Sequence, residues 1–147
     1  MRLWHYKLLP YLPKSQLLAQ WRELNSIFKK QDKHILINYI YNYKKSDLYN
    51  YTLLVMIEMD IRGYRVKSLD NYYDFFKDYI GSAEIYTDVF KKHHTKEYLL
   101  QCFMNLEEKF ERFQSDFDRE TYLKLWNFVN NELDGLLETI SVKTRED

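Results

Sequence analysis

Apolar residues recur at helical spacing between positions 15 and 30. They stand at intervals of four, three and four, at Leu17, Trp21, Leu24 and Phe28. These side chains share one helical face, so the pattern predicts a helix from about Ser15 to Lys30, with Ser15 as its N-cap. Glu23 falls nearly opposite this stripe and Arg22 lies on its flank, so an acid and a base face outward side by side. Such a pair is ordinarily a solvated surface pair.

A second predicted helix is apolar on most sides. Ser46 is suited to cap it, its apolar residues run from Leu48 to Ile61, and Gly63 supplies a left-handed residue after its end. A helix that is apolar nearly all round is usually a central one, so we expect this helix in the middle of the fold.

Two further helices are predicted in the C-terminal half. The first starts after Thr95 and ends near Phe113, with apolar spacings of three and four. The second is opened by residues 115–118 and repeats that spacing through Tyr122, Trp126, Val129, Leu133, Leu136 and Ile140. Two such seams joined by a short polar turn indicate an antiparallel helical hairpin over residues 95–141. The second seam, over residues 117–141, is alternatively the contact of a homodimer.

The remaining segments are less regular. Residues 1–13 carry Pro10 and Pro13 and predict an extended arm, held to the core by Leu3, Trp4, Leu8 and Leu9. The stretch 34–43 fits either a strand or a helix. One or two short helices are expected in 68–94, which is broken at Gly81-Ser82, and a loose tail in 143–147. The sequence therefore predicts an all-α, compact single-domain bundle of about four main helices with an extended N-terminal arm.

Composition agrees with a globular helical protein. The chain has 147 residues, 46% of them hydrophobic, and only three Gly and two Pro, which favours long helices over tight turns. A single cysteine, Cys102, excludes an internal disulfide and suits a reducing compartment. We expect it to be buried and inert. No apolar run reaches the roughly 20 residues of a membrane span, and no signal peptide is recognisable, so we expect a cytoplasmic protein.

Charge is unevenly distributed along the chain. Residues 1–67 hold twelve basic and five acidic side chains, a net charge of +7. Because the formal net charge of the whole chain is zero, the remainder carries −7. A chain divided in this way can present a basic face to a polyanion such as DNA. Alternatively, the two halves pair with each other.

The histidines and tyrosines give weaker indications. His93 and His94 are adjacent, so on a helix their side chains point about 100° apart, and no third ligand has useful spacing. We therefore predict no metal site. The tyrosines of 34–43, beside Lys44 and Lys45, either stack on nucleic-acid bases or pack with their hydroxyl groups in solvent.

The N-terminal half resembles the pyrimidine-dimer DNA glycosylase family of the phage endonuclease V type. The resemblance covers residues 1–67, with a weaker match over 93–111. The run ending Arg62-Gly63-Tyr64 matches the close of that family's second helix, and the opening Met1-Arg2-Leu3-Trp4-His5 resembles uncharacterised bacterial members often grouped with it. The matching positions in the first helix and its exit are Leu17, Ala19, Arg22, Glu23, Leu24, Phe28, Lys33 and His34.

The resemblance implies a DNA repair glycosylase with AP-lyase activity and no metal or other cofactor. Such enzymes attack C1′ of the damaged nucleotide with the chain's own α-amine, and a glutamate assists ring opening and then β-elimination. An α-amine suits this task because its ordinary pKa, about 7.7–8.0, leaves an unprotonated fraction at neutral pH. The family's nucleophile is a threonine uncovered by loss of the initiator methionine. Here Arg2 blocks that trimming, so the implied catalytic residues are Met1 and Glu23.

The implied partner is double-stranded damaged DNA. Its phosphates would be held by Arg2, Arg22, Lys29, Lys30 and Lys33, and His34 would contact DNA or support Glu23. The family's early asparagine is Trp4 here, and its arginine three residues after the glutamate is Ser26. Two alternatives keep the family fold: a DNA-binding domain without catalysis, and a protein-interaction domain that docks through the acidic hairpin 95–141.

Overall fold

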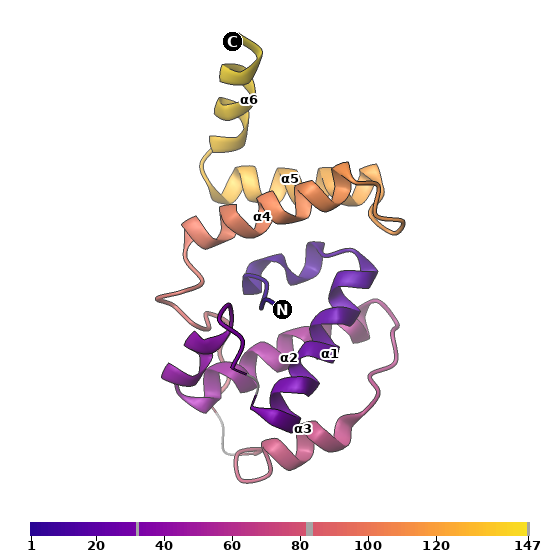
Figure 1. Ribbon diagram of the computed structural model, residues 1–147, viewed down its shortest axis with the longest axis vertical. Helices are drawn as coiled ribbons and strands as arrows, with labels where there is room; N and C mark the ends of the chain where they lie inside the picture. The colour runs from indigo at the N-terminus through magenta and orange to yellow at the C-terminus, as the bar shows by residue number, and fades with distance from the viewer. Residues whose placement is uncertain (32, 82–83, 147) are drawn as a thin grey trace.

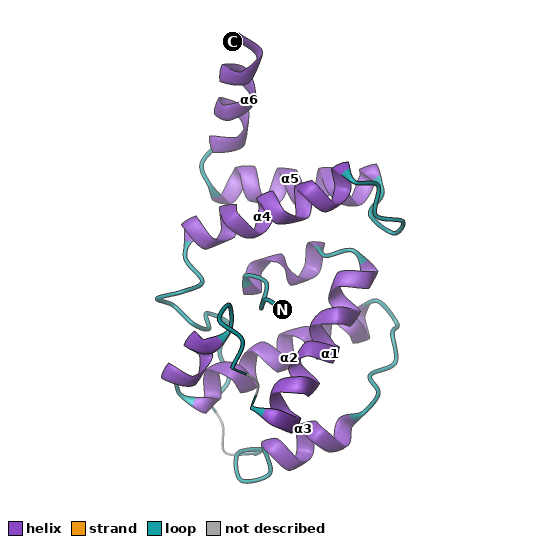
Figure 2. Ribbon diagram, in the orientation of Figure 1, coloured by secondary structure: helices purple, strands orange, loops and turns teal. Residues whose placement is uncertain are grey.

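The computed structural model describes residues 1–31, 33–81 and 84–146, with side chains up to Ser141. The described part is helical and holds no strand (Figure 2), which confirms the all-α prediction. Its α-helices are α1 (Lys14–Lys30), α2 (Lys45–Ile61), α3 (Leu69–Phe75), α4 (Lys96–Glu111), α5 (Arg119–Glu132) and α6 (Leu136–Glu146). Two 3-10 helices accompany them, η1 (Tyr6–Tyr11) and η2 (Asn38–Asn42).

Helix α1 agrees closely with the predicted pattern. Its apolar stripe is buried, with Leu17 and Leu24 fully inaccessible, and it packs against α2 and α3. The predicted N-cap is wrong: Pro13 occupies that position without a side-chain cap. Ser15 lies inside the first turn, where its backbone N–H and hydroxyl group both bond to Asp116. The helix ends at Gln31, whose left-handed backbone lets its N–H bond to Ile27 O at 2.8 Å.

Helix α2 lies at the middle of the lower group of helices in Figure 1. It packs against α1, η1 and η2, and its residues Tyr51, Val55 and Met59 are buried. The predicted apolar surround holds only in part, because Ile57 and Ile61 are 52% and 72% exposed. Gly63 has the predicted left-handed backbone, with φ of 77°. The cap predicted at Ser46 is wrong, since Lys44 is the N-cap residue and Ser46 lies within the helix.

Helices α4 and α5 pack side by side as the predicted antiparallel hairpin (Figure 1). Thr95 begins α4 by accepting the N–H of Tyr98, and Asp118 begins α5 by accepting the N–H of Thr121. Cys102 is buried in the core, as predicted. Phe113 departs from the predicted seam: it lies beyond the end of α4 with a left-handed backbone, and its side chain is 91% exposed.

The predicted fourth helix is divided in two. Asp134 and Gly135 both have positive φ, 55° and 85°, and end the helical hydrogen bonding after α5. The Asn130 side chain then accepts the N–H of Glu138 and starts α6. Helix α6 projects away from the rest of the molecule in Figure 1. It continues to Glu146, so the loose tail predicted from residue 143 is wrong for the described part, and Asp147 lies outside it. The homodimer through 117–141 stays a prediction.

Between residues 31 and 95 the structure settles the irregular segments. The stretch 34–43, whose pattern fits either a strand or a helix, contains η2. Within 68–94, α3 is the single helix of the described residues. Ser82, part of the predicted break after Gly81, lies outside them. No helix of the described part combines the length and the apolar character that crossing a membrane requires.

The N-terminal segment forms a layer between the α4–α5 hairpin and the helices below it (Figure 1). A continuous extended arm is wrong: residues 1–5 have no regular structure, but 6–11 form η1, which packs against α2 and α5. The short 3-10 helix tolerates Pro10, although a proline argues against a longer helix here. The four apolar residues expected to hold the segment are buried, Leu3, Trp4, Leu8 and Leu9.

Arg62 fixes the far end of this segment. Its guanidinium donates to the carbonyl oxygens of Leu12 at 2.7 Å, Pro10 at 3.1 Å and Leu9 at 3.2 Å, and it pairs with Glu58 at 2.8 Å. One side chain at the end of α2 thus holds the last turn of η1 and the link into α1. The start of the chain is thereby directed back over α1.

Candidate active site

Met1 and Glu23 line the same cavity, of about 230 Å³. The structure therefore brings together the two residues that the resemblance implies as catalytic. The cavity lies between the chain start, α1 and α4, and its other lining residues are Arg2, Trp4, Gln16, Leu36, Asn105 and Lys109. The Arg2 guanidinium carbon stands 5.9 Å from the ring centre of Trp4, the residue that replaces the family's asparagine. Two lining residues, Asn105 and Lys109, come from α4.

The Glu23 carboxylate is half-buried and interacts with the amino terminus. Burial raises the pKa of Glu23 above its ordinary value. The positive charge of the amino terminus is the largest opposing influence, ahead of the backbone N–H of Arg2 and the charges of Arg22 and Lys109. A carboxyl group with a raised pKa beside an amine is suited to accept and return a proton.

Gln20 connects this carboxylate to the chain start. Its side chain is fully buried one turn before Glu23 on α1. The amide nitrogen donates to Arg2 O at 3.0 Å and to Glu23 Oε2 at 2.9 Å, and the amide oxygen accepts the N–H of Trp4 at 2.8 Å. No sequence signal points to this role, because a glutamine beside an apolar stripe has no recognisable partner until the tertiary contacts are known.

Two buried tyrosines hold the backbone of residues 3 and 4. Tyr51 on α2 shares its hydroxyl proton between Trp4 O, at 2.7 Å, and Gln20 Oε1, at 2.8 Å. Tyr98 on α4 donates to Leu3 O at 2.6 Å. Burial raises the pKa of both tyrosines, so both hydroxyl groups stay protonated and keep their donor role. The chain start is thus held from α1, α2 and α4 at once.

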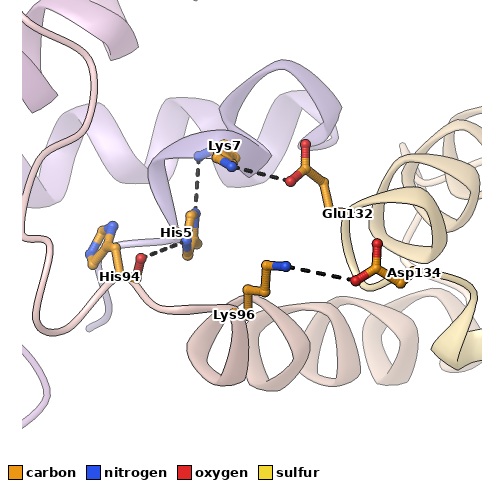
Figure 3. A network of polar contacts seen from close by, with 6 residues as sticks. All are labelled: His5, Lys7, His94, Lys96, Glu132 and Asp134. Atoms are coloured by element: carbon orange, nitrogen blue, oxygen red, sulfur yellow. Dashed lines mark hydrogen bonds and ion pairs between the residues drawn. The ribbon is translucent and has the colours of Figure 1, made fainter.

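A pair of neutral histidines anchors the next residues (Figure 3). His5 Nε2 bonds to His94 O at 2.9 Å, while its Nδ1 accepts the N–H of Lys7. His94 Nδ1 accepts the N–H of Tyr6, and its Nε2 meets the hydroxyl group of Tyr39 at 2.8 Å. Burial lowers the pKa of His5 to about 4 and that of His94 to about 2. Both imidazoles therefore serve as neutral acceptors of backbone N–H groups.

These bonds account for residues whose role the sequence leaves open. Tyr39 is half-buried and stacks on His93 at 4.5 Å between ring centres, which favours packing over stacking on bases. Figure 3 also shows Lys7 paired with Glu132 at 3.1 Å, an ion pair that joins the two halves of the chain, and Lys96 near Asp134 at 3.8 Å, within the C-terminal half. Among the described residues no three metal-ligating side chains form a cluster.

A second, larger cavity of about 550 Å³ lies on another side of α1. Four basic side chains surround it, and its described lining contains no acidic residue. Trp21, Tyr64 and Leu18 give it an apolar wall. The basic residues are Arg22, Lys14, Arg65 and Lys67. Of these four, the sequence predicts only Arg22 as a DNA contact. Lys14 is far from Arg65 and Lys67 in the sequence, and the packing of α1 on α2 brings them together.

The remaining predicted DNA contacts lie outside both cavities. Lys29 and Lys30 are exposed in the last turn of α1, about 10 Å along the helix axis from Glu23. Lys33 and His34 are exposed in the connection after this helix. His34 Nδ1 accepts the N–H of Leu36, so the imidazole stabilises a turn, and its contact with DNA or Glu23 stays a prediction.

Comparison with known proteins gives one finding. Residues 1–72 match the family model described as pyrimidine dimer DNA glycosylase. No curated protein and no solved structure matches the chain. The matched segment contains Met1, Gln20, Glu23 and Tyr51, whereas α4, with Tyr98 and Lys109, lies beyond it. The match supports a DNA repair glycosylase role at the level of the family. This match, over just under half of the chain, supports the resemblance of the N-terminal half to the pyrimidine dimer DNA glycosylase family.

Proposed function

We propose that this protein is a DNA glycosylase with AP-lyase activity that acts on pyrimidine dimers or a related lesion in double-stranded DNA. The Met1 α-amine is its nucleophile and Glu23 its assisting acid and base. The observation that carries the proposal is that the amino terminus and the Glu23 carboxylate line one cavity and interact electrostatically. The family match supports the substrate class.

The proposed reaction needs no group beyond these two. The unprotonated amine attacks C1′ of the damaged nucleotide, and the bond from C1′ to the base breaks. The departing base takes one proton from the amine. Glu23 as an acid delivers a proton to O4′ while the sugar ring opens, which leaves a protonated imine between C1′ and the amine nitrogen. Glu23 as a base then removes a C2′ proton, the C3′–O3′ bond breaks, and water releases the product from the amine.

Basic residues around α1 would hold the duplex. Arg2 lines the proposed catalytic cavity. Arg22 lines the second cavity together with Lys14, Arg65 and Lys67, and the described lining of that cavity contains no acidic residue. Lys29, Lys30 and Lys33 would extend this contact toward the end of α1, with His34 at its margin. Phosphate contacts of this kind fix the position of the DNA without selecting its sequence.

Borohydride trapping tests the proposal. The protein is mixed with duplexes carrying an abasic site or a pyrimidine dimer, reduced, and any covalent adduct is mapped by peptide mass spectrometry. We expect the adduct on residue 1, its loss after selective acetylation of the amino terminus, and a strong decrease in Glu23→Gln.

Lys109 supplies the necessary control, because it is the other amine in the cavity. A Lys109→Met variant should still form the adduct. An adduct on Lys109, or none on either duplex, would refute the proposed nucleophile. Salt-sensitive binding of the duplex without any adduct would instead identify a DNA-binding domain that lacks catalysis.

A further inference from the structure

We propose that Gln20 is a positioning residue that holds the Met1 amine and the Glu23 carboxylate in one fixed arrangement. The inference rests on the proposed function. It concerns a residue that contacts Glu23 and the backbone next to Met1 but contributes no reacting atom.

The four contacts of the Gln20 amide fix its orientation. Its oxygen accepts from the Trp4 N–H and from the Tyr51 hydroxyl group, each at 2.8 Å. Because a backbone N–H can only donate, the amide oxygen must face Trp4. The amide nitrogen therefore faces Arg2 O and Glu23 Oε2, and both of its hydrogens are used. No other orientation of the amide satisfies these partners.

These contacts act on both sides of the proposed site. On the chain start, Gln20 holds Arg2 O and Trp4 N, which flank Leu3, so Met1 is only one residue beyond a fixed backbone position. Consecutive Cα atoms are about 3.8 Å apart, which limits how far the amine can move. On α1, the same amide holds one oxygen of Glu23, which lies three residues later on the same helical side. A single buried side chain thus sets the separation between nucleophile and carboxylate.

A purely structural glutamine would also satisfy buried polar groups, so the test needs a readout specific to Glu23. The Gln20 N–H donated to Glu23 favours the charged carboxylate. Its removal should therefore raise the pKa of Glu23 further. Gln20→Met removes all four contacts at similar length. Gln20→Glu keeps the acceptor toward Trp4 but replaces the amide donor with a second carboxyl group beside Glu23. Two neighbouring carboxylates cannot both be charged, so the upper midpoint of the pair is raised. Gln101→Met, at an exposed glutamine of α4, is the matched control.

Two measurements are made on the full chain. The first monitors Glu23 ionisation by carbon-13 NMR of labelled glutamate carboxyl groups, assigned with Glu23→Gln. We expect a higher midpoint in Gln20→Met and Gln20→Glu, and none of this shift in Gln101→Met. The second measures single-turnover cleavage of an abasic duplex against pH. We expect the cleavage rate of both Gln20 variants to be lower by about tenfold or more, because misplaced reacting groups react more slowly. The acidic limb of the curve of cleavage rate against pH should move to higher pH, while the affinity for the duplex stays near the parent value.

The outcomes separate this inference from the proposed function. If the parent protein forms no adduct, the proposed function fails, while the NMR titration still tests the link between Gln20 and Glu23. An unchanged Glu23 midpoint in both Gln20 variants would overturn the inference, as would parent-like cleavage with an unshifted pH profile. Circular dichroism of each variant identifies unfolding. If Gln20→Met does not fold, Gln20→Glu decides the question, because it keeps the buried acceptor.

Discussion

Replacing Arg62 tests whether the chain start is held in place from the end of α2. In Arg62→Met the protein loses three bonds from the guanidinium to the carbonyl groups of residues 9, 10 and 12. At about 1 kcal/mol for each hydrogen bond, the variant should be less stable by roughly 3 kcal/mol. For a chain of this size that corresponds to a fall in Tm of roughly 6–12 °C.

Arg112→Met is the matched control. Arg112 also pairs with a glutamate four residues earlier, Glu108, but 78% of its side chain is exposed. Exposed pairs of this kind contribute about 0–1 kcal/mol, so Tm should hardly change. Thermal melting and urea unfolding of both variants measure the difference. Equal losses in the two variants would refute the argument, because the ion pair with Glu58, and not the carbonyl contacts, would then account for the effect of Arg62.

Further predictions concern the site and its surroundings. Glu23→Gln should slow single-turnover strand cleavage about 10²-fold with unchanged duplex affinity, since it removes the acid and base but no phosphate contact. Arg65→Glu should weaken duplex binding and reduce the slope of log affinity against log salt by about 1 in gel-shift titrations, whereas a parent-like slope would exclude the second cavity from the DNA contact. Because the pKa of His5 is lowered to about 4 in the folded protein, against an ordinary value of 6.5, the unfolded chain binds more protons between these pH values. The contribution of neutral His5 to the free energy of unfolding is therefore complete above pH 6.5 and decreases as the pH falls, by about 2 kcal/mol from pH 7 to 5. Urea unfolding midpoints should show this decrease in the parent protein and a smaller one in His5→Gln.

The parts of the fold that sequence could predict are those set by neighbours within one or two turns. The stripe from Leu17 to Phe28 forms α1 because its period alone specifies the buried side. Gly63 adopts its left-handed backbone for an equally local reason. The Asp134-Gly135 pair is also a visible signal for a helix end. This signal is hidden by the apolar spacing that continues to Ile140, because α6 has the same apolar periodicity as α5 although its axis points in another direction.

The site depends on contacts between distant segments, which periodicity does not encode. Ser15 is a reasonable N-cap by type, but the nearby Asp116 takes its hydrogen bonds. Lys109 belongs to the acidic half, and nothing in its neighbourhood indicates that α4 crosses near the amino terminus. Met1 and Glu23 were accessible only through the resemblance, since no local pattern relates a chain terminus to a carboxylate 22 residues later.

Tyr98 and His94, from the C-terminal half of the chain, form hydrogen bonds to residues 3 and 6. The structure of the segment that matches the family, residues 1–72, therefore depends on the C-terminal half. A fragment ending at residue 72 would retain every position of the family match, yet Leu3 O and Tyr6 N would each lose a bond. In this fragment, the apolar side chains of η1 that pack against α5 in the full chain would be exposed to water. Residues 1–72 grafted onto another protein would therefore carry both reacting groups but would not hold them in the same relative position. The new protein would have to supply a phenol that bonds to Leu3 O and an imidazole that bonds to Tyr6 N.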